Sequence, residues 1–268
     1  RGALEPEQAC GRLLVPPGAA QRFVDHTVLE LLDRGVEVHA LVAERRSRNL
    51  LLGQERPDLS RQRVGTDHGR IGKNHDALAR RIGDEVTRIL TEGGARRGFE
   101  LLDQSGLLQV LLPEMVALKG TPQSPDYHPE GDVFAHTLLL LSHLAPSSSE
   151  TLAYGCLLHD IAKPVCFRQE TDRITFYGHT EVGAAMAEEI LKRLKRSRES
   201  WERVAYLVRN HLRHVQAPQM RLSTLKRFLR EEGIEELLEL TRIDALASNG
   251  DLQYYHFCKE RLAQLSEA

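Results

Sequence analysis

A histidine and an aspartate are adjacent at His159–Asp160, in the segment LLHDIAKP. An imidazole nitrogen and a carboxylate oxygen both bind divalent transition ions, so this pair is typical of a metal site. The preceding Leu157 and Leu158 indicate the edge of an apolar core, where an unpaired carboxylate is costly and a bound cation removes the cost. Because consecutive helical residues point about 100° apart, both side chains reach one ion only near a helix end, which Pro164 is expected to provide, or with the ion between them.

Three further polar residues sit among apolar neighbours. His136 opens the stretch HTLLLLSHL, His211 follows an apolar helical stripe, and Asp244 lies within LTRIDALA. A lone histidine of this kind is more often a core residue hydrogen-bonded to backbone. Several such groups on separate helices are harder to explain one by one, and helical bundles build metal sites from facing helices. The combination favours a divalent transition metal (Ni, Co, Mn, Fe or Zn), with Mg as a further option.

Other polar residues near these motifs each have two interpretations. Lys163, four residues after His159, either contacts a substrate phosphate or is a solvated lysine near a helix C-terminus. The basic run at 191–200 can contact RNA phosphates, although a solvated helix end is the commoner explanation. The candidates for a second ion or for substrate contact are His179, His211, His128 and Arg213.

The composition excludes several classes of protein. In 268 residues, 36 Lys and Arg balance 38 Asp and Glu for a net charge of -2, so a general polyanion binder is disfavoured. The four cysteines are far apart without C-x-x-C spacing, which argues against a disulfide framework and favours a reducing, cytoplasmic setting. No run reaches the roughly 18 apolar residues of a membrane helix, so no membrane partner is expected.

The elements that must position these residues are predicted to be helices. From His75 to Thr91, Leu78, Ile82 and Val86 recur every four residues as an apolar stripe. Residues 119–132 form a Pro- and Gly-rich connection, and Arg173–Tyr177 is the one short extended segment expected. A turn at 107–112 is expected to lead into Pro113, and further helices are expected at 95–105, 133–145, 150–162, 180–196, 200–214, 222–232 and 235–248. The predicted fold class is all-α.

Residues 1–70 differ in composition from the rest of the chain. They contain eleven Arg but no Lys, Ile, Tyr, Trp or Met, and they open without Met. Only Phe23 to Glu44 has the pattern of a helix followed by a strand. We expect partial or complete disorder here, or a truncated or out-of-frame region of a larger protein.

These motifs resemble those of a known superfamily. His136, His159–Asp160 and Asp244 resemble the H…HD…D pattern of the HD superfamily of metal-dependent phosphohydrolases. The ordered segments ARRGFELLDQSGLLQVLLPEMVALKG, HPEGDVFAHTLLLL, LLHDIAKP, GHTEVGAAMAEEILKRLK and VRNH resemble the C-terminal half of bacterial tRNA nucleotidyltransferases and poly(A) polymerase-like proteins. The resemblance covers about residues 71–250.

The resemblance implies a domain order and a set of residue roles. Residues 71–118 would be a helical neck that contacts tRNA, 119–250 an HD domain, and 251–268 a C-terminal helix. The implied metal ligands are His136, His159, Asp160 and Asp244, with Lys163 as phosphate partner. Residues 1–70 lack the Gly-Ser turn and D-x-D pair that hold Mg in the nucleotidyltransferases, so this chain is not expected to add CCA or poly(A) alone.

The resulting hypothesis is hydrolysis of phosphomonoesters, nucleotides or 2′,3′-cyclic phosphodiesters, in which Asp160 and Lys163 are the catalytic residues. The ion would lower the pKa of a water and polarise a phosphoryl oxygen, while Lys163 or a histidine neutralises developing charge. One alternative is a non-catalytic tRNA- or RNA-binding fragment of a CCA-adding or poly(A) polymerase-like enzyme without its nucleotidyltransferase site. Another is a helical scaffold in which the His and Asp groups are satisfied core residues.

Overall fold

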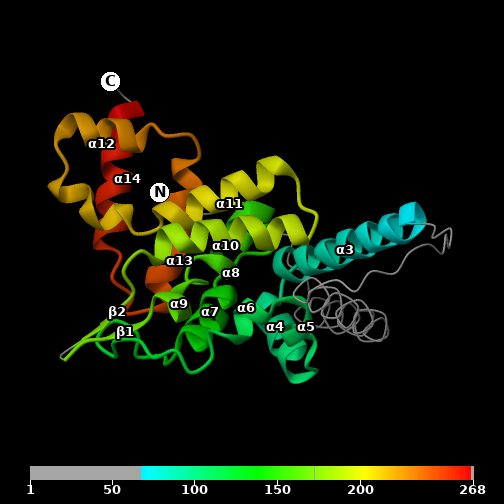
Figure 1. The fold of residues 1–268 in the computed structure, drawn as a ribbon. Helices are drawn as coiled ribbons and strands as arrows, with labels where there is room; N and C mark the ends of the chain where they lie inside the picture. The colour runs from blue at the N-terminus through cyan, green and yellow to red at the C-terminus, as the bar shows by residue number, and fades with distance from the viewer. Residues whose placement is uncertain (1–67, 172, 267–268) are drawn as a thin grey trace, which may run out of the picture.

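The structure, a computed structural model, describes residues 68–171 and 173–266, and these residues form an all-α fold as predicted (Figure 1). The helices of this part are α3 (His68–Thr91), α4 (Ala95–Gln104), α5 (Leu107–Leu111), α6 (Pro113–Val116), α7 (Val133–Ser142), α8 (Glu150–Leu158), α9 (Lys163–Cys166), α10 (His179–Arg193), α11 (Arg198–Asn210), the 3-10 helix η1 (Arg213–Gln219), α12 (Leu222–Leu229), α13 (Ile234–Ala247) and α14 (Gln253–Ser266). The expected helix and strand at 23–44 lie outside the described residues.

The sheet in the described residues is a small two-stranded hairpin. β1 (Arg168–Gln169) pairs antiparallel with β2 (Ile174–Thr175), with Arg168 opposite Thr175. The extended segment predicted at 173–177 contains β2. The sequence did not indicate β1, because two exposed polar residues carry no alternation of apolar and polar positions.

The predicted helix at 150–162 ends earlier than expected, and this is a correction. Helix α8 stops at Leu158, and Pro164 lies in the first turn of α9 instead of ending α8. Proline is tolerated there because the first helical N–H groups have no partner within the helix. Residues 159–162 therefore form a turn between two helices, and this turn carries the His-Asp pair.

Helix α8 is the centre of the core. Its residues from Leu152 to Leu158 are all buried, which is typical of a helix that is covered on every side. It packs against α3, α7, α11 and α13. The Oγ of Ser149 accepts a hydrogen bond from the N–H of Leu152 and so caps the first turn.

The neck is joined to the rest of the chain through α3 and α6. Val86 and Ile89 of α3 are fully buried, and the hydroxyl of Thr87 lies 3.0 Å from that of Tyr154 in α8. Arg193 at the end of α10 makes two hydrogen bonds to the carboxylate of Glu114, at 2.7 and 2.8 Å. The neck and the helices after residue 132 therefore share one core.

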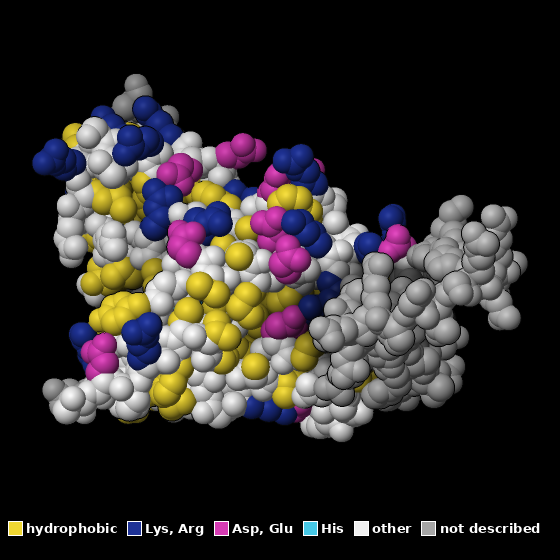
Figure 2. Space-filling model, in the orientation of Figure 1, with side chains coloured by type: hydrophobic (Ala, Val, Ile, Leu, Met, Phe, Trp, Pro, Cys, Tyr) yellow, Lys and Arg dark blue, Asp and Glu magenta, His cyan; other side chains and the backbone are white. Residues whose placement is uncertain are grey.

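The basic residues at 191–200 form ion pairs with other residues of the chain. Besides Arg193, two of them, Lys195 and Arg196, pair with Asp76 and Asp84 of α3. Lys192 and Arg198 pair with Glu188 and Glu202 at exposed positions, which agrees with the solvated interpretation for these two residues. On the face shown in Figure 2, basic and acidic side chains alternate over α10 and α11, in agreement with the near-zero net charge. Among the described helices, none has the length and apolar character needed to cross a membrane.

We expect the crossing of α8 and α11 to be sensitive to volume at Gly155. A Cβ there would lie 3.0 Å from Cδ1 of Leu207, which is the flexible end of a side chain. Gly155→Ala should be nearly neutral because the gain in helix propensity offsets the contact. Gly155→Val should lower the free energy of unfolding by about 1 to 3 kcal/mol through overpacking. Urea unfolding of both variants tests this, and equal stability of the Val variant and the wild type would contradict it.

Candidate metal centre

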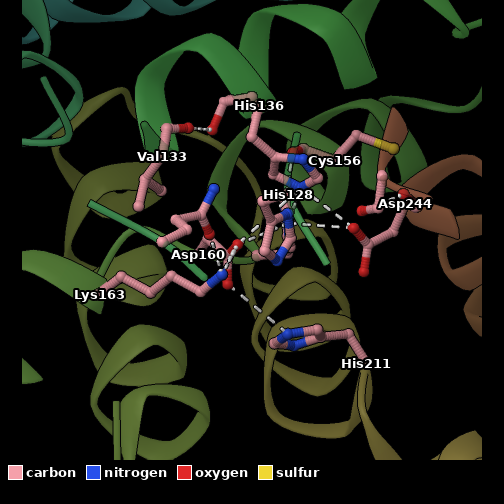
Figure 3. Close-up of polar contacts among 12 residues, drawn as sticks. His128, Val133, His136, Cys156, Asp160, Lys163, His211 and Asp244 are labelled. Atoms are coloured by element: carbon pink, nitrogen blue, oxygen red, sulfur yellow. Dashed lines mark hydrogen bonds and ion pairs between the residues drawn. The ribbon is translucent and has the colours of Figure 1, made fainter. Parts of the chain in front are cut away.

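Three segments deliver the predicted ligands to one place. His136 lies in α7, His159 directly follows α8, Asp160 lies in the turn, and Asp244 lies in α13. Figure 3 shows His136, Asp160 and Asp244 pointing toward one another from these elements. Gly183 of α10 lies against the turn and α11, since a Cβ there would lie 3.2 Å from Cγ1 of Val208 and 3.6 Å from Cβ of Ala162.

The ligand atoms lie at distances suited to one ion. Nε2 of His136 is 3.3 Å from Nε2 of His159 and 3.1 Å from Oδ1 of Asp244. Oδ2 of Asp160 lies 3.1 Å from Nε2 of His159 and 4.0 Å from Nε2 of His136. Ligands about 2.1 Å from an ion and at right angles are about 3 Å apart. The four atoms therefore have the spacing of a coordination shell.

The protonation of the imidazoles supports this arrangement. Nδ1 of His159 donates to the carbonyl oxygen of Cys156 at 3.0 Å, and Nδ1 of His136 donates to the carboxylate of Glu130 at 2.6 Å. Both partners are pure acceptors, so each Nδ1 carries the hydrogen. In a neutral ring, each Nε2 then presents a lone pair toward the other ligands, as a metal-binding histidine requires.

A second group of ligand atoms adjoins the first. Oδ1 of Asp160 lies 3.6 Å from Nε2 of His179 and 3.8 Å from Nε2 of His211. Both histidines donate through Nδ1 to backbone carbonyls, those of Phe176 and Val208. Neither Oδ1 of Asp160 nor Nε2 of His179 has a hydrogen-bond partner among the described residues, although both atoms are buried. Asp160 therefore joins two clusters of acceptors that can each hold a metal ion.

Burial and neighbouring charges set the pKa values in the centre. Burial alone would raise the pKa of Asp160, but His159 and Lys163 outweigh it and hold that pKa well below its usual range. Burial lowers the pKa of His211 to about 4, with His159 adding to the effect, so His211 is neutral at pH 7. Burial also disfavours the charged form of His136, yet Asp244 and Glu130 raise its pKa to about 9.

Lys163 contacts the centre from a position that the sequence did not predict. It is the first residue of α9, not a lysine at a helix C-terminus, and it is only 7% exposed. Its Nζ lies 2.7 Å from Oδ2 of Asp160 and 2.5 Å from Oε1 of Gln123. The solvated alternative for Lys163 is therefore wrong, and its charge faces the metal ligands.

Two residues of the 119–132 connection were missed. Glu130 accepts hydrogen bonds from Nδ1 of both His128 and His136, at 2.9 and 2.6 Å, and so orients a ligand from outside the cluster. Gln123 holds Lys163. The one signal in the sequence was the polar segment HPEGD directly before the helix of His136.

Arg213 is the predicted site residue whose contacts lie away from the metal centre. Its guanidinium binds the carboxylate of Glu231 through two hydrogen bonds of 2.8 and 2.9 Å, and it lies over the ring of Phe228. These contacts anchor η1 to the end of α12. The structure brings together the other predicted residues, which are His128, His136, His159, Asp160, Lys163, His179, His211 and Asp244.

Comparison with known families places this centre in context. Residues 132–249 match the family model described as HD domain. This chain contains an HD domain. Residues 76–118 match a second model, described as the probable RNA and SrmB-binding site of polymerase A. The HD match contains all four residues of the first cluster, and the second match lies within the neck.

The curated relatives that match this chain are longer proteins. The chain is 35% identical over 248 residues to the CC-adding tRNA nucleotidyltransferase of Thermus thermophilus, covering 89% of this chain and 53% of that protein. It is 35% identical over 184 residues to the multifunctional CCA protein of Halorhodospira halophila (65% and 44% covered) and 34% over 177 residues to the A-adding tRNA nucleotidyltransferase of Deinococcus radiodurans (63% and 40%). The chain thus spans about half the length of the relatives it matches.

Replacing Glu130 should weaken metal binding without removing a ligand. Glu130→Gln exchanges the charged acceptor that orients His136 for a neutral amide, and changes of this kind typically lower affinity by about 10- to 100-fold. Competition with a fluorescent chelator measures the effect. Glu260→Gln, an exposed carboxylate on α14, is the matched control and should bind metal as the wild type does. Equal affinities of the two variants would exclude the orienting role.

Metal binding should release a proton from His136. Its pKa of about 9 in the metal-free chain means that Nε2 is protonated at pH 7 and must lose this proton to bind an ion. Apparent affinity should therefore increase with pH up to about 9. Calorimetry at pH 7 in buffers of different ionisation enthalpy should detect about one released proton. Affinity that does not change between pH 6.5 and 9 would contradict this assignment.

Proposed function

We propose that this chain is a metal-dependent phosphohydrolase whose HD domain acts on phosphomonoesters, nucleotides or 2′,3′-cyclic phosphodiesters. The observation that carries the proposal is the convergence of two imidazole nitrogens and two carboxylates beside the buried ammonium of Lys163. The match to the HD family supports it. A scaffold role would leave Oδ1 of Asp160 and Nε2 of His179 buried without a hydrogen-bond partner among the described residues.

Asp160 and Lys163 have the central roles in this mechanism. A divalent ion in the centre supplies Lewis-acid polarisation of a phosphoryl oxygen and a water of lowered pKa. Asp160 contributes one oxygen to each cluster, so it would fix the position of whatever binds at both. The ammonium of Lys163 offsets negative charge on the phosphoryl group as the bond to the leaving group breaks. His211, neutral at pH 7, presents the lone pair of Nε2 to the second cluster.

The donor set favours a transition metal over Mg. His136 and His159 supply two nitrogen ligands to the first cluster, and His179 and His211 supply two to the second. Imidazole suits Zn, Cu, Fe and Ni, whereas Mg prefers oxygen ligands and retained waters. We therefore propose Ni, Co, Mn, Fe or Zn as the activating ion, with Mg weaker.

We further propose that the neck contacts tRNA. The family match at 76–118 and the tRNA nucleotidyltransferase relatives support this role. On α4, Arg96 and Arg97 are 49% and 43% exposed, and both face Glu100 in pairs at the helix surface. Such exposed pairs are weak, so both cations remain able to bind phosphate. A purely RNA-binding protein is not favoured, because that role would not account for the buried centre.

Asp160→Ala should abolish metal-dependent hydrolysis and leave the helical content nearly intact. The variant loses one oxygen from each cluster and the partner of Lys163. The assay compares a generic phosphomonoester and 2′,3′-cyclic AMP with Ni, Co, Mn, Mg or chelator. Asp126→Ala, at an exposed position, is the control and should retain activity. Full activity in the Asp160 variant, or no wild-type hydrolysis with any metal, would refute the proposed function.

Reversing charge on α4 should weaken tRNA binding but not hydrolysis of a small phosphoester. Arg96→Glu with Arg97→Glu should lower the affinity at low salt at least tenfold, and the slope of log affinity against log salt should fall by about 2. Filter binding at several salt concentrations measures both quantities. Arg227→Glu with Arg230→Glu, at two exposed positions in α12 and directly after it, is the matched control. Equal losses in the two double variants would indicate nonspecific attraction.

A further inference from the structure

Gln123, in the 119–132 connection, is a buried amide whose orientation is fixed by chemistry. It is 7% exposed, and its Oε1 lies 2.5 Å from Nζ of Lys163. A lysine ammonium only donates hydrogen bonds, so the amide must present its oxygen to Lys163 and turn Nε2 away. Nε2 is buried and has no acceptor among the described residues. An unpaired buried N–H group costs about 1 to 3 kcal/mol, which indicates a missing partner.

Lys163 has donor capacity to spare at the same position. Its Nζ donates to Oδ2 of Asp160 and to Oε1 of Gln123, which uses two of its three N–H bonds. Because the two ends of an amide are about 2.3 Å apart, Nε2 of Gln123 lies within about 5 Å of this ammonium. Free N–H groups of two side chains therefore lie close together beside the metal ligands.

We propose that Gln123 and Lys163 form a binding subsite for the non-bridging oxygens of a phosphoryl group. The inference rests on the proposed function, since it specifies which residues bind the phosphoryl group of its substrates. A phosphate carries several acceptor oxygens on one small tetrahedron, so one anion can accept from Nε2 and Nζ together. Asp160 alone would repel such an anion, and Lys163 offsets that charge.

Two hydrogen bonds join the two ends of the connection that carries Gln123. The N–H of Gly120 donates to Oδ2 of Asp132 at 2.7 Å, and the N–H of Val133 donates to the carbonyl oxygen of Thr121 at 3.2 Å. The side chains of His128 and Asp244 are each 19% exposed, so the edge of the centre is in contact with solvent. The same connection thus positions a metal ligand through Glu130 and a substrate donor through Gln123.

The test observes the Gln123 side-chain amide directly. In the full ¹⁵N-labelled chain loaded with one equivalent of Zn²⁺, inorganic phosphate should shift the Nε2–H resonances of Gln123 in a saturable manner. The resonances of Gln109, an exposed glutamine on α5, should not move. Assignment through the backbone makes this titration of the wild type independent of any variant. Phosphate that fails to bind, or that binds without shifting these resonances, overturns the proposal, because a trapped water then accounts for Nε2.

A pair of matched variants measures the contribution to affinity. Gln123→Glu replaces the free donor with an acceptor-only carboxylate, and it should weaken phosphate binding to the Zn²⁺-loaded chain at least tenfold. Gln109→Glu adds the same charge elsewhere and should bind phosphate as the wild type does. Unchanged phosphate affinity in Gln123→Glu overturns the proposal. If phosphate shifts Gln123 but no ester is hydrolysed, the subsite stands and the proposed hydrolysis fails.

Discussion

The rest of the structure depends on holding mutually facing acceptor atoms together. His136, His159 and Asp244 bring lone pairs and negative charge within 3.1 to 3.8 Å of one another, with Nδ1 hydrogens directed outward. Such a group would separate if its elements were free to move, because the proton on Nε2 of His136 attracts Asp244 but leaves the other acceptor atoms facing one another without a partner. The buried α8 and the short turn after it prevent this, since both are covered by α7, α10, α11 and α13.

Asp160 is the residue that contacts the largest number of these acceptor groups. It occupies a turn, where its two oxygens can face different directions, and each oxygen meets a different pair of histidines. In the middle of a helix its side chain would share one face with residues three and four positions away, and it would reach fewer of these groups. The early end of α8 is therefore what allows one carboxylate to serve two clusters.

Much of this centre can be predicted from the sequence. The rest cannot, and particular residues show why. His136, His159 and Asp244 stand out because polar residues within apolar helical stretches violate periodicity. Glu130 and Gln123 lie in an irregular connection, where polar residues are expected and no pattern separates a buried side chain from a solvated one. The prediction that Pro164 ends a helix is wrong because proline both ends helices and begins them. Only the three-dimensional course of the chain distinguishes these two positions.

The sharing of one core between the neck and the HD domain has a consequence for how such proteins arise. Two family matches divide the chain between residues 118 and 132, but Ile89 and Tyr154 are buried on either side of that division within the same core. A gene fusion that transferred only the segment after residue 118 would leave the surface of Tyr154 and its neighbours exposed. Recombination that preserves the fold must therefore carry α3 along with the metal centre, so the two segments are inherited as one module.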